Sequence, residues 1–169
     1  MPYTLNQLAA DIRETLKADA GPAGRAKVNA FVQRALTDPV FITAELGERA
    51  PGANPRQVLY EDPELGFCIC GHVYDGPARG SPHDHGQSWA IYGQATGVTE
   101  MTDWRIVEKG SGDNPTLVEA VKTYAMNPGD AHLYDVGDVH SPNRDAPVRL
   151  VRIEGKNLDH VKRSNIKAK

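Results

Sequence analysis

The pattern of hydrophobic and polar positions changes in character near residue 50. Before that point apolar residues recur every three or four positions, which predicts amphipathic helices. After residue 55, short runs rich in β-branched and aromatic residues alternate with clusters of Gly, Pro, Asp and Asn, as is typical of antiparallel sheets. A chain of 169 residues is the size of one domain. We therefore expect a single domain over 1–169, with a helical segment at 1–50 and a β-barrel at 55–155.

Three helices are expected in the first segment. Thr4 and Gln7 form the pattern of a capping box, so the first helix should span 4–19. Pro22 suits the first turn of a second helix, which should end near residue 37. A short third helix is expected at 38–46. These helices are predicted to cover one face of a sheet, because each has one apolar stripe.

Nine strands and a basic tail are expected after the helices. The tail, 156–169, is basic and is expected to fray. The predicted strands lie at 57–60, 66–74, 83–85, 88–93, 98–108, 116–126, 131–135, 140–142 and 148–154.

Charge and hydropathy exclude several classes of partner. The chain has 19 Lys and Arg against 22 Asp and Glu, interspersed along its length, so neither nucleic acid nor a membrane surface is an expected partner. No apolar run approaches the roughly 20 residues that cross a bilayer, and the N-terminus lacks a signal-peptide pattern. Cys68 and Cys70 are the only cysteines and are predicted to be core residues in a reducing compartment. A cytoplasmic location is therefore expected.

Candidate metal ligands are concentrated in two short stretches. His83 and His85 are separated by one residue, so on an extended segment both side chains point the same way. Imidazole is the commonest neutral metal ligand, and a third histidine from a neighbouring strand would complete one face of a metal. His140 is the best candidate for that third ligand. The competing interpretation is that His83 and His85 are polar turn residues that bind nothing.

The surroundings of these histidines resemble the two motifs of the cupin superfamily. The first motif is matched by the HDH sequence at 83–85 and by Gly97. The second is matched by 135–140 and by Asn143, although Asp135 replaces the usual Pro. The resemblance implies a cupin double-stranded β-helix, a mainly β jelly-roll barrel, preceded here by about three helices. Homodimers are common among such barrels, so a homodimer is also a candidate assembly.

One departure from the general motif narrows the resemblance. Ala90 or Trp89 occupies the slot of the usual metal-binding Glu, so three histidines remain without a carboxylate. This arrangement, with PHDHG at 82–86, is similar to the cysteine dioxygenase-like thiol dioxygenases. That resemblance implies a mononuclear non-haem iron(II) enzyme that oxidises a small thiol, of cysteine or mercaptocarboxylate type, to its sulfinate with O2. Zinc, nickel or manganese in the same site are alternatives.

The family resemblance also suggests residues that contact the substrate. In the family an Arg ahead of the first motif binds the substrate carboxylate, and Arg56 stands at about that place, with Gln57 as the adjacent alternative. An exposed charge at a strand start is the competing interpretation of Arg56. Tyr92 should share the inward face of Ala90, where it would either offer a phenol to the substrate or pack in the barrel.

The last strand departs from the family and leaves the reaction open. A Ser, His and Tyr are expected at alternate positions, where this chain has Leu150, Arg152 and Glu154, and the cysteine that cross-links to that Tyr is Ala90. If Arg152 and Glu154 point inward they should form a buried ion pair or an anion clamp; otherwise they face solvent. Two other functions therefore remain: a non-catalytic cupin that binds a small molecule, and a metal-dependent isomerase or hydrolase.

Overall fold

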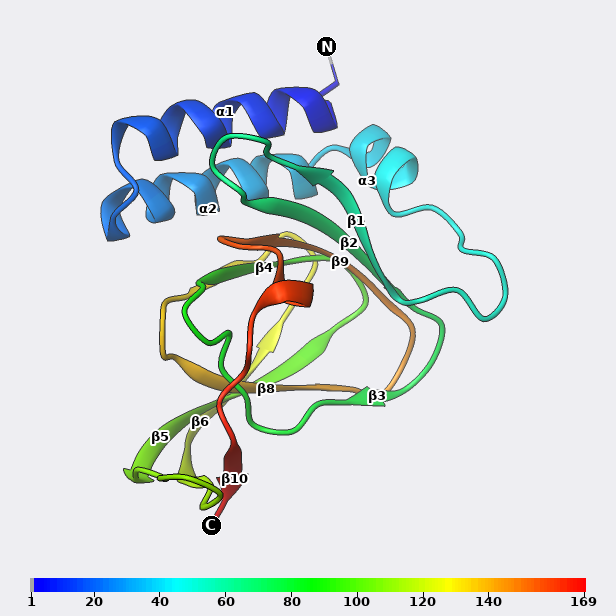
Figure 1. Ribbon diagram of the computed structural model, residues 1–169. Coiled ribbons are helices and arrows are strands. Elements are labelled where there is room, and N and C mark those ends of the chain that lie inside the picture. Colours follow the sequence, from blue (N-terminus) through cyan, green and yellow to red (C-terminus); the bar gives the residue numbers. More distant parts are fainter. Residues whose placement is uncertain (1) are drawn as a thin grey trace.

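Two curled β-sheets face each other beneath a layer of helices, in a computed structural model that describes residues 2–169 (Figure 1). The helices are α1 (Leu5–Ala18), α2 (Pro22–Leu36) and α3 (Pro39–Glu45). The first two were predicted from the apolar spacing, and the third from the cap and first turn at Asp38 and Pro39. The capping box of α1 is present, since the Thr4 side chain accepts from the Gln7 N–H and the Gln7 side chain accepts from the Thr4 N–H.

The strands form two five-stranded sheets. The sheet beneath the helices has the order β1 (Arg56–Glu61), β2 (Cys68–Tyr74), β9 (Val148–Glu154), β4 (Ala90–Thr96) and β7 (Ala131–Tyr134). The second sheet has the order β10 (Ile166–Ala168), β6 (Thr116–Met126), β5 (Thr99–Glu108), β8 (Val139–Arg144) and β3 (Ala78–Arg79). Every pairing is antiparallel except that of β10 with β6.

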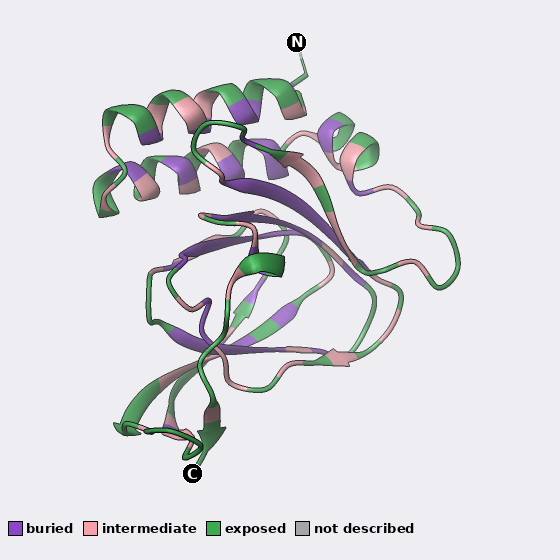
Figure 2. Cartoon of the chain, viewed as in Figure 1, coloured by how far each residue is buried: buried purple, intermediate pink, exposed green. Residues whose placement is uncertain are grey.

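Side-chain alternation on the first sheet separates two cores. On β4, Ile91 points towards the helices, where it joins Leu8, Val32 and Ile153 in the larger hydrophobic cluster. Its neighbours Ala90 and Tyr92 point the other way, into the barrel. The middle strands of this sheet, β2, β9 and β4, are buried, whereas the outer part of the β5–β6 hairpin in the second sheet is exposed (Figure 2). The inward face of this sheet therefore decides which polar side chains reach the barrel interior.

Gly93 keeps α2 close to the sheet, and replacing it tests this layer. A Cβ at Gly93 would lie 2.6 Å from Cγ1 of Val32 and 3.0 Å from Cδ1 of Leu36. Valine has little rotamer freedom in a helix, so the contact cannot be relieved cheaply. We expect Gly93→Ala to destabilise the fold by about 1–3 kcal/mol in urea unfolding. Gly76→Ala, whose Cβ would meet nothing within 4 Å, is the control and should stay within about 0.5 kcal/mol of the parent.

The C-terminal segment differs from the expected fraying tail. It contains a 3-10 turn, η1 (Leu158–His160), and ends in β10, which pairs with β6. Leu158 is buried, and the Ser164 hydroxyl donates to Asp84 over 2.6 Å. Burial, strand pairing and hydrogen bonds offset the entropy lost when this segment is ordered. The expectation of a frayed tail at 156–169 is therefore corrected.

The predicted strand at 83–85 is also corrected. Only His83 makes ladder hydrogen bonds, in an isolated bridge to His140. The chain then turns, because the Asp84 carboxylate accepts from the Gly86 N–H over 3.1 Å. The short strand β3, which pairs with the end of β8, was not expected.

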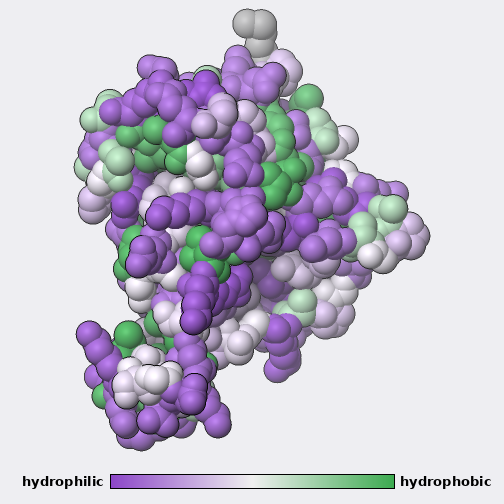
Figure 3. Space-filling view, viewed as in Figure 1, coloured by the Kyte–Doolittle hydropathy of each residue, from purple (hydrophilic) through white to green (hydrophobic). Residues whose placement is uncertain are grey.

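The visible surface is mostly hydrophilic, and its apolar residues form small separate areas over both the helices and the barrel (Figure 3). Within residues 2–169, no helix combines the length and the hydrophobicity needed to cross a bilayer.

Candidate metal site and adjoining pocket

The structure brings His83, His85 and His140 together, as the motif spacing predicted. One potential ligand atom from each lies within 4.8 Å of the other two. The ring of His140 lies 4.6 Å from that of His83 and 4.8 Å from that of His85, between centroids. The bridge between His83 and His140 fixes this approach, since each N–H donates to the other residue's carbonyl over 3.0 Å.

The glycines of the two motifs lie in tight turns at the ends of strands. Gly137 has a φ of 87° in the turn that leads into β8, and Gly97 has a φ of 69° in the turn that ends β4. Side chains other than glycine rarely adopt this left-handed conformation. The glycines of both motifs therefore have a structural reason to be where they are.

The ring nitrogens of the three histidines are suited to a metal. The Nδ1–H of His83 donates to the carbonyl of Ser81 over 2.9 Å, which leaves Nε2 with a free lone pair. Nδ1 of His85 and both ring nitrogens of His140 are buried without a hydrogen-bond partner in the described chain. Buried polar atoms without partners are rare in folded proteins. A metal ion bound by one nitrogen of each ring would give part of this set the partner that the protein does not provide.

The three imidazoles are neutral near pH 7, the state that binds metals. Burial lowers the pKa of His83 to about 4 and that of His85 to about 3. Burial, reinforced by the two neighbouring histidines, holds the pKa of His140 well below its usual value. The ring of Tyr134 stacks on His140 at 3.9 Å between centroids and limits its rotation.

Ala90 occupies the position of the metal-binding Glu of the general cupin motif. Of the two candidates, Ala90 faces the barrel, whereas Trp89 packs in the cluster under the helices. Asp84, between the two clustered histidines, is anchored by Ser164 and Gly86 and is not part of the set. The donor set is therefore three neutral nitrogens. Such a set fits a divalent transition metal and leaves coordination positions for other ligands.

Tyr92 links the histidines to a buried ion pair. Its hydroxyl lies 3.2 Å from Nε2 of His85 and accepts from Nη1 of Arg152, also over 3.2 Å. Nε and Nη2 of Arg152 both donate to Oε1 of Glu154, over 2.8 and 2.5 Å. Arg152 and Glu154 thus point inward and form the ion pair that strand alternation had suggested.

Arg56 lies behind this pair and does not line the pocket. It donates to both carboxylate oxygens of Glu154, over 3.0 and 2.7 Å, and to Asp159 over 2.9 Å. Burial alone would raise the pKa of Glu154, but hydrogen bonds from Arg56 and the charge of Arg152 hold it at about 2. The structure therefore does not bring Arg56 to the histidines, and its guanidinium is already taken by carboxylates.

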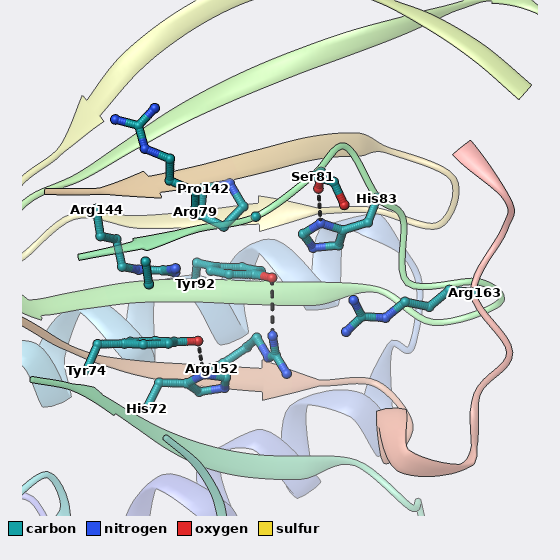
Figure 4. Close-up of a pocket in the computed structure, with 12 residues that line it drawn as sticks. His72, Tyr74, Arg79, Ser81, His83, Tyr92, Pro142, Arg144, Arg152 and Arg163 are labelled. Atoms are coloured by element: carbon teal, nitrogen blue, oxygen red, sulfur yellow. Dashed lines mark hydrogen bonds between the residues drawn. The ribbon is translucent and has the colours of Figure 1, made fainter. Parts of the chain in front are cut away.

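A pocket of about 350 Å³ opens beside His83 (Figure 4). No Asp or Glu lines it, whereas four arginines do. Arg163 reaches it from the C-terminal segment, which Figure 4 shows on the side of His83. Its lining residues are His72, Tyr74, Ala78, Arg79, Gly80, Ser81, His83, Tyr92, Pro142, Arg144, Arg152 and Arg163.

Sequence reasoning missed several of these residues. Arg144 follows His140 by four positions on β8, so alternation on a strand would have placed both on one face. His72 had no motif and was interpreted as structural. Arg163 lies in the segment that was expected to fray. His132 lines a different pocket, where its ring packs against Tyr134 at 4.5 Å between centroids.

Comparisons with known proteins identify the fold and no finer family. No protein-family model matches the chain, and no curated protein matches it. Among solved structures, an uncharacterized conserved protein with a double-stranded β-helix domain from Klebsiella pneumoniae is 12% identical, with a TM-score of 0.50 over 74% of this chain and 88% of that one. A cupin superfamily protein from Desulfitobacterium hafniense is 11% identical, with a TM-score of 0.47 over 65% of this chain and 84% of that one.

A third similar structure is KdgF from Halomonas, at 16% identity and a TM-score of 0.45, over 63% of this chain and 82% of that one. The predicted fold, the double-stranded β-helix of cupins preceded by three helices, is confirmed. None of these neighbours singles out the cysteine dioxygenase-like branch.

Proposed function

We propose that this chain is a mononuclear iron(II) enzyme that oxidises a small thiol with an anionic group to its sulfinate. The observation that carries the proposal is the set of three neutral histidines, two of which have buried ring nitrogens without a partner, beside a pocket that is lined by arginines and by no carboxylate. Three neutral ligands leave the charge of a divalent metal uncompensated, which favours an anionic thiolate. Arginines favour a second anionic group on the same molecule.

The proposed reaction balances without a further reductant. When bound, iron(II) supplies the redox chemistry that brings a thiol and O2 to react. The sulfur of RSH gains both atoms of O2 to give RSO2H, so sulfur is oxidised by four electrons and O2 is reduced by four. The chain's part is to orient the thiol beside the histidines and to limit the access of water.

Tyr92 is the side chain best placed to contact the substrate directly, since it lines the pocket and lies beside His85. Arg152 lines the same pocket and also orients the Tyr92 hydroxyl. Arg56 acts one step further away, because it holds Glu154, which holds Arg152. We therefore assign Arg152 and Arg56 as positioning residues and Tyr92 as the contact to the substrate.

The pocket favours oxidation over proton-transfer chemistry. An isomerase that moves a proton between carbon atoms needs a side chain that acts as general base near the working pH. The titratable side chains that line this pocket, besides His83, are arginines, two tyrosines and His72, whose pKa burial holds well below its usual value. The second candidate function is therefore a protein that binds a small anion without reaction, which the same arginines would serve.

Oxygen uptake tests the proposal directly. Protein loaded with iron(II) without air should consume O2 when given 3-mercaptopropionate or cysteine, and 18O2 should place two labelled atoms in the sulfinate found by mass spectrometry. Zinc-loaded protein is the control and should consume none, because zinc has no redox chemistry. Iron bound at one per chain with no thiol-dependent oxygen uptake would reject the proposed thiol dioxygenase activity. The second candidate, a protein that binds a small anion without reaction, would then be left.

A further inference from the structure

Arg144 is a buried cation without a counter-ion. It is 4% exposed, and its side chain makes no hydrogen bond or salt bridge to any residue of the described chain. Its Nε is sealed from solvent without a partner, and its guanidinium lies 4.5 Å from the ring centroid of Tyr74. A tyrosine face compensates only part of the cost of burying a charge.

The other arginines around the pocket differ from Arg144 in this respect. Arg152 is paired with Glu154 at 2.5 Å. Arg79 is exposed and lies 3.5 Å from Asp145. Arg163 is exposed, so water screens its charge. Arg144 is thus the one buried guanidinium of the pocket lining that lacks a carboxylate within residues 2–169.

His72 supplies a second unpartnered group in the same pocket. It is 3% exposed, its Nδ1 lies 3.4 Å from the Tyr74 hydroxyl, and its Nε2 has no partner. When Tyr74 donates to Nδ1, the proton of the neutral ring is on Nε2, which can then donate to an anion. Figure 4 shows His72 and Arg144 with Tyr74 at the same end of the pocket, away from Arg163.

We infer that Arg144, assisted by Nε2 of His72, binds an oxyanion group of the molecule that occupies this pocket. A guanidinium offers two parallel N–H groups that match the oxygens of a carboxylate, sulfonate or phosphate. The other end of the molecule then reaches His83 at the opposite side of the pocket, a statement that rests on the proposed function. This assigns to Arg144 the anion recognition that the sequence had suggested for Arg56.

Anion binding by the metal-free protein tests the inference without any catalysis. Acetate, methanesulfonate and inorganic phosphate are titrated against chloride at fixed ionic strength, with the unfolding midpoint and calorimetry as readouts. The wild type should show saturable stabilisation by at least one of the three, and the one that binds tightest identifies the oxyanion class. Arg144→Gln should bind that anion at least 10-fold more weakly, whereas Arg105→Gln should bind it like the wild type. Arg105 is the matched control, since its side chain is 69% exposed and pairs with Glu119 outside the pocket.

The variants also separate a binding role from a structural one. Without anion, Arg144→Gln should unfold at the same temperature as the wild type or higher, because it removes an uncompensated buried charge. His72→Phe keeps an aromatic side chain but loses the N–H donor, so it should weaken binding of the same anion several-fold. This variant tests the inference in the case that Arg144→Gln does not fold. No saturable binding by the wild type, or equal binding by wild type and Arg144→Gln, overturns the inference.

Failure of this inference is distinguishable from failure of the proposed function. If anions bind through Arg144 but iron-loaded protein oxidises no thiol, the anion subsite is supported and the proposed dioxygenase activity is rejected. If thiol oxidation occurs and Arg144→Gln retains the wild-type KM, the proposed dioxygenase activity is supported and the anion subsite is rejected. Iron content of Arg144→Gln, measured in parallel, should equal that of the wild type because Arg144 is not among the clustered histidines.

Discussion

Replacing Glu154 with glutamine is expected to lower the free energy of unfolding by about 3–5 kcal/mol, as is usual when one partner of a buried ion pair is removed. Glu154 is fully buried and compensates two guanidinium groups, those of Arg152 and Arg56. It also accepts from the Leu158 N–H over 3.0 Å, which ties the C-terminal segment to the barrel. Urea unfolding followed by circular dichroism measures the change.

Glu119→Gln is the matched control for this prediction. Glu119 pairs with Arg105 over 3.2 Å on the exposed part of β5 and β6, where such pairs contribute about 0–1 kcal/mol. If Glu154→Gln costs no more than Glu119→Gln, the buried network does not stabilise the fold.

Acid unfolding gives an independent readout of the same network. The folded-state pKa of Glu154, about 2, lies below its ordinary value of 4.5. A depressed carboxyl pKa contributes stability that is complete above the unfolded-state pKa and is lost as the pH falls through the folded one. The wild type should therefore lose stability between about pH 4.5 and 2 more steeply than Glu154→Gln. Parallel pH profiles for the two proteins would contradict the prediction.

The elements of the fold were predictable because their signals are local. The capping box at Thr4 and the apolar stripes identify the helices. The 110–115 loop separates the long strands β5 and β6, and the turn at Asn127–Asp130 separates β6 from β7, as expected. The segment at 83–85 was not predicted correctly, since Gly86 and the Asp84 turn end the ladder after one bridge. The prediction for the C-terminal segment was wrong for a different reason. This segment is ordered by contacts with Asp84 and β6, which are distant from it in the sequence.

The candidate site was predictable where a motif and strand alternation coincide. His83, His85 and His140 meet as expected, and Tyr92 shares the inward face of Ala90 as alternation predicted. For Arg152 and Glu154 the sequence left two faces open, and the structure places both side chains in the barrel. The partners of these groups could not be predicted. That Arg56 binds Glu154, while Arg144 has no acid beside it, follows only from the way distant strands pack. The alternation of side chains along a strand predicts which face of the sheet a residue occupies, but its partner depends on which distant strands pack beside it.

Replacing His140 with alanine is expected to abolish stoichiometric metal binding. Loss of residues that merely orient metal ligands already costs about 10–100-fold in affinity, so the loss of a ligand should cost more. The wild type should retain about one metal ion per chain after dialysis, and adding iron(II) or zinc at 100 times the Kd should stabilise it by about 2.7 kcal/mol. Elemental analysis and metal-dependent thermal shifts measure the two effects.

His132→Ala is the control that separates this site from a general effect of losing a histidine. His132 lies on β7 among tyrosines, outside the three-histidine cluster, so its removal should leave metal content and the metal-dependent shift unchanged. His83→Ala and His85→Ala should behave like His140→Ala, because each supplies one of the three donors. Metal retained at one ion per chain in His140→Ala would place the ligands elsewhere. A wild type that binds no metal after reconstitution under reducing conditions would reject the metal site and, with it, the oxidation chemistry. The binding of anions at Arg144 would not be affected by that result, because it is measured on the metal-free protein.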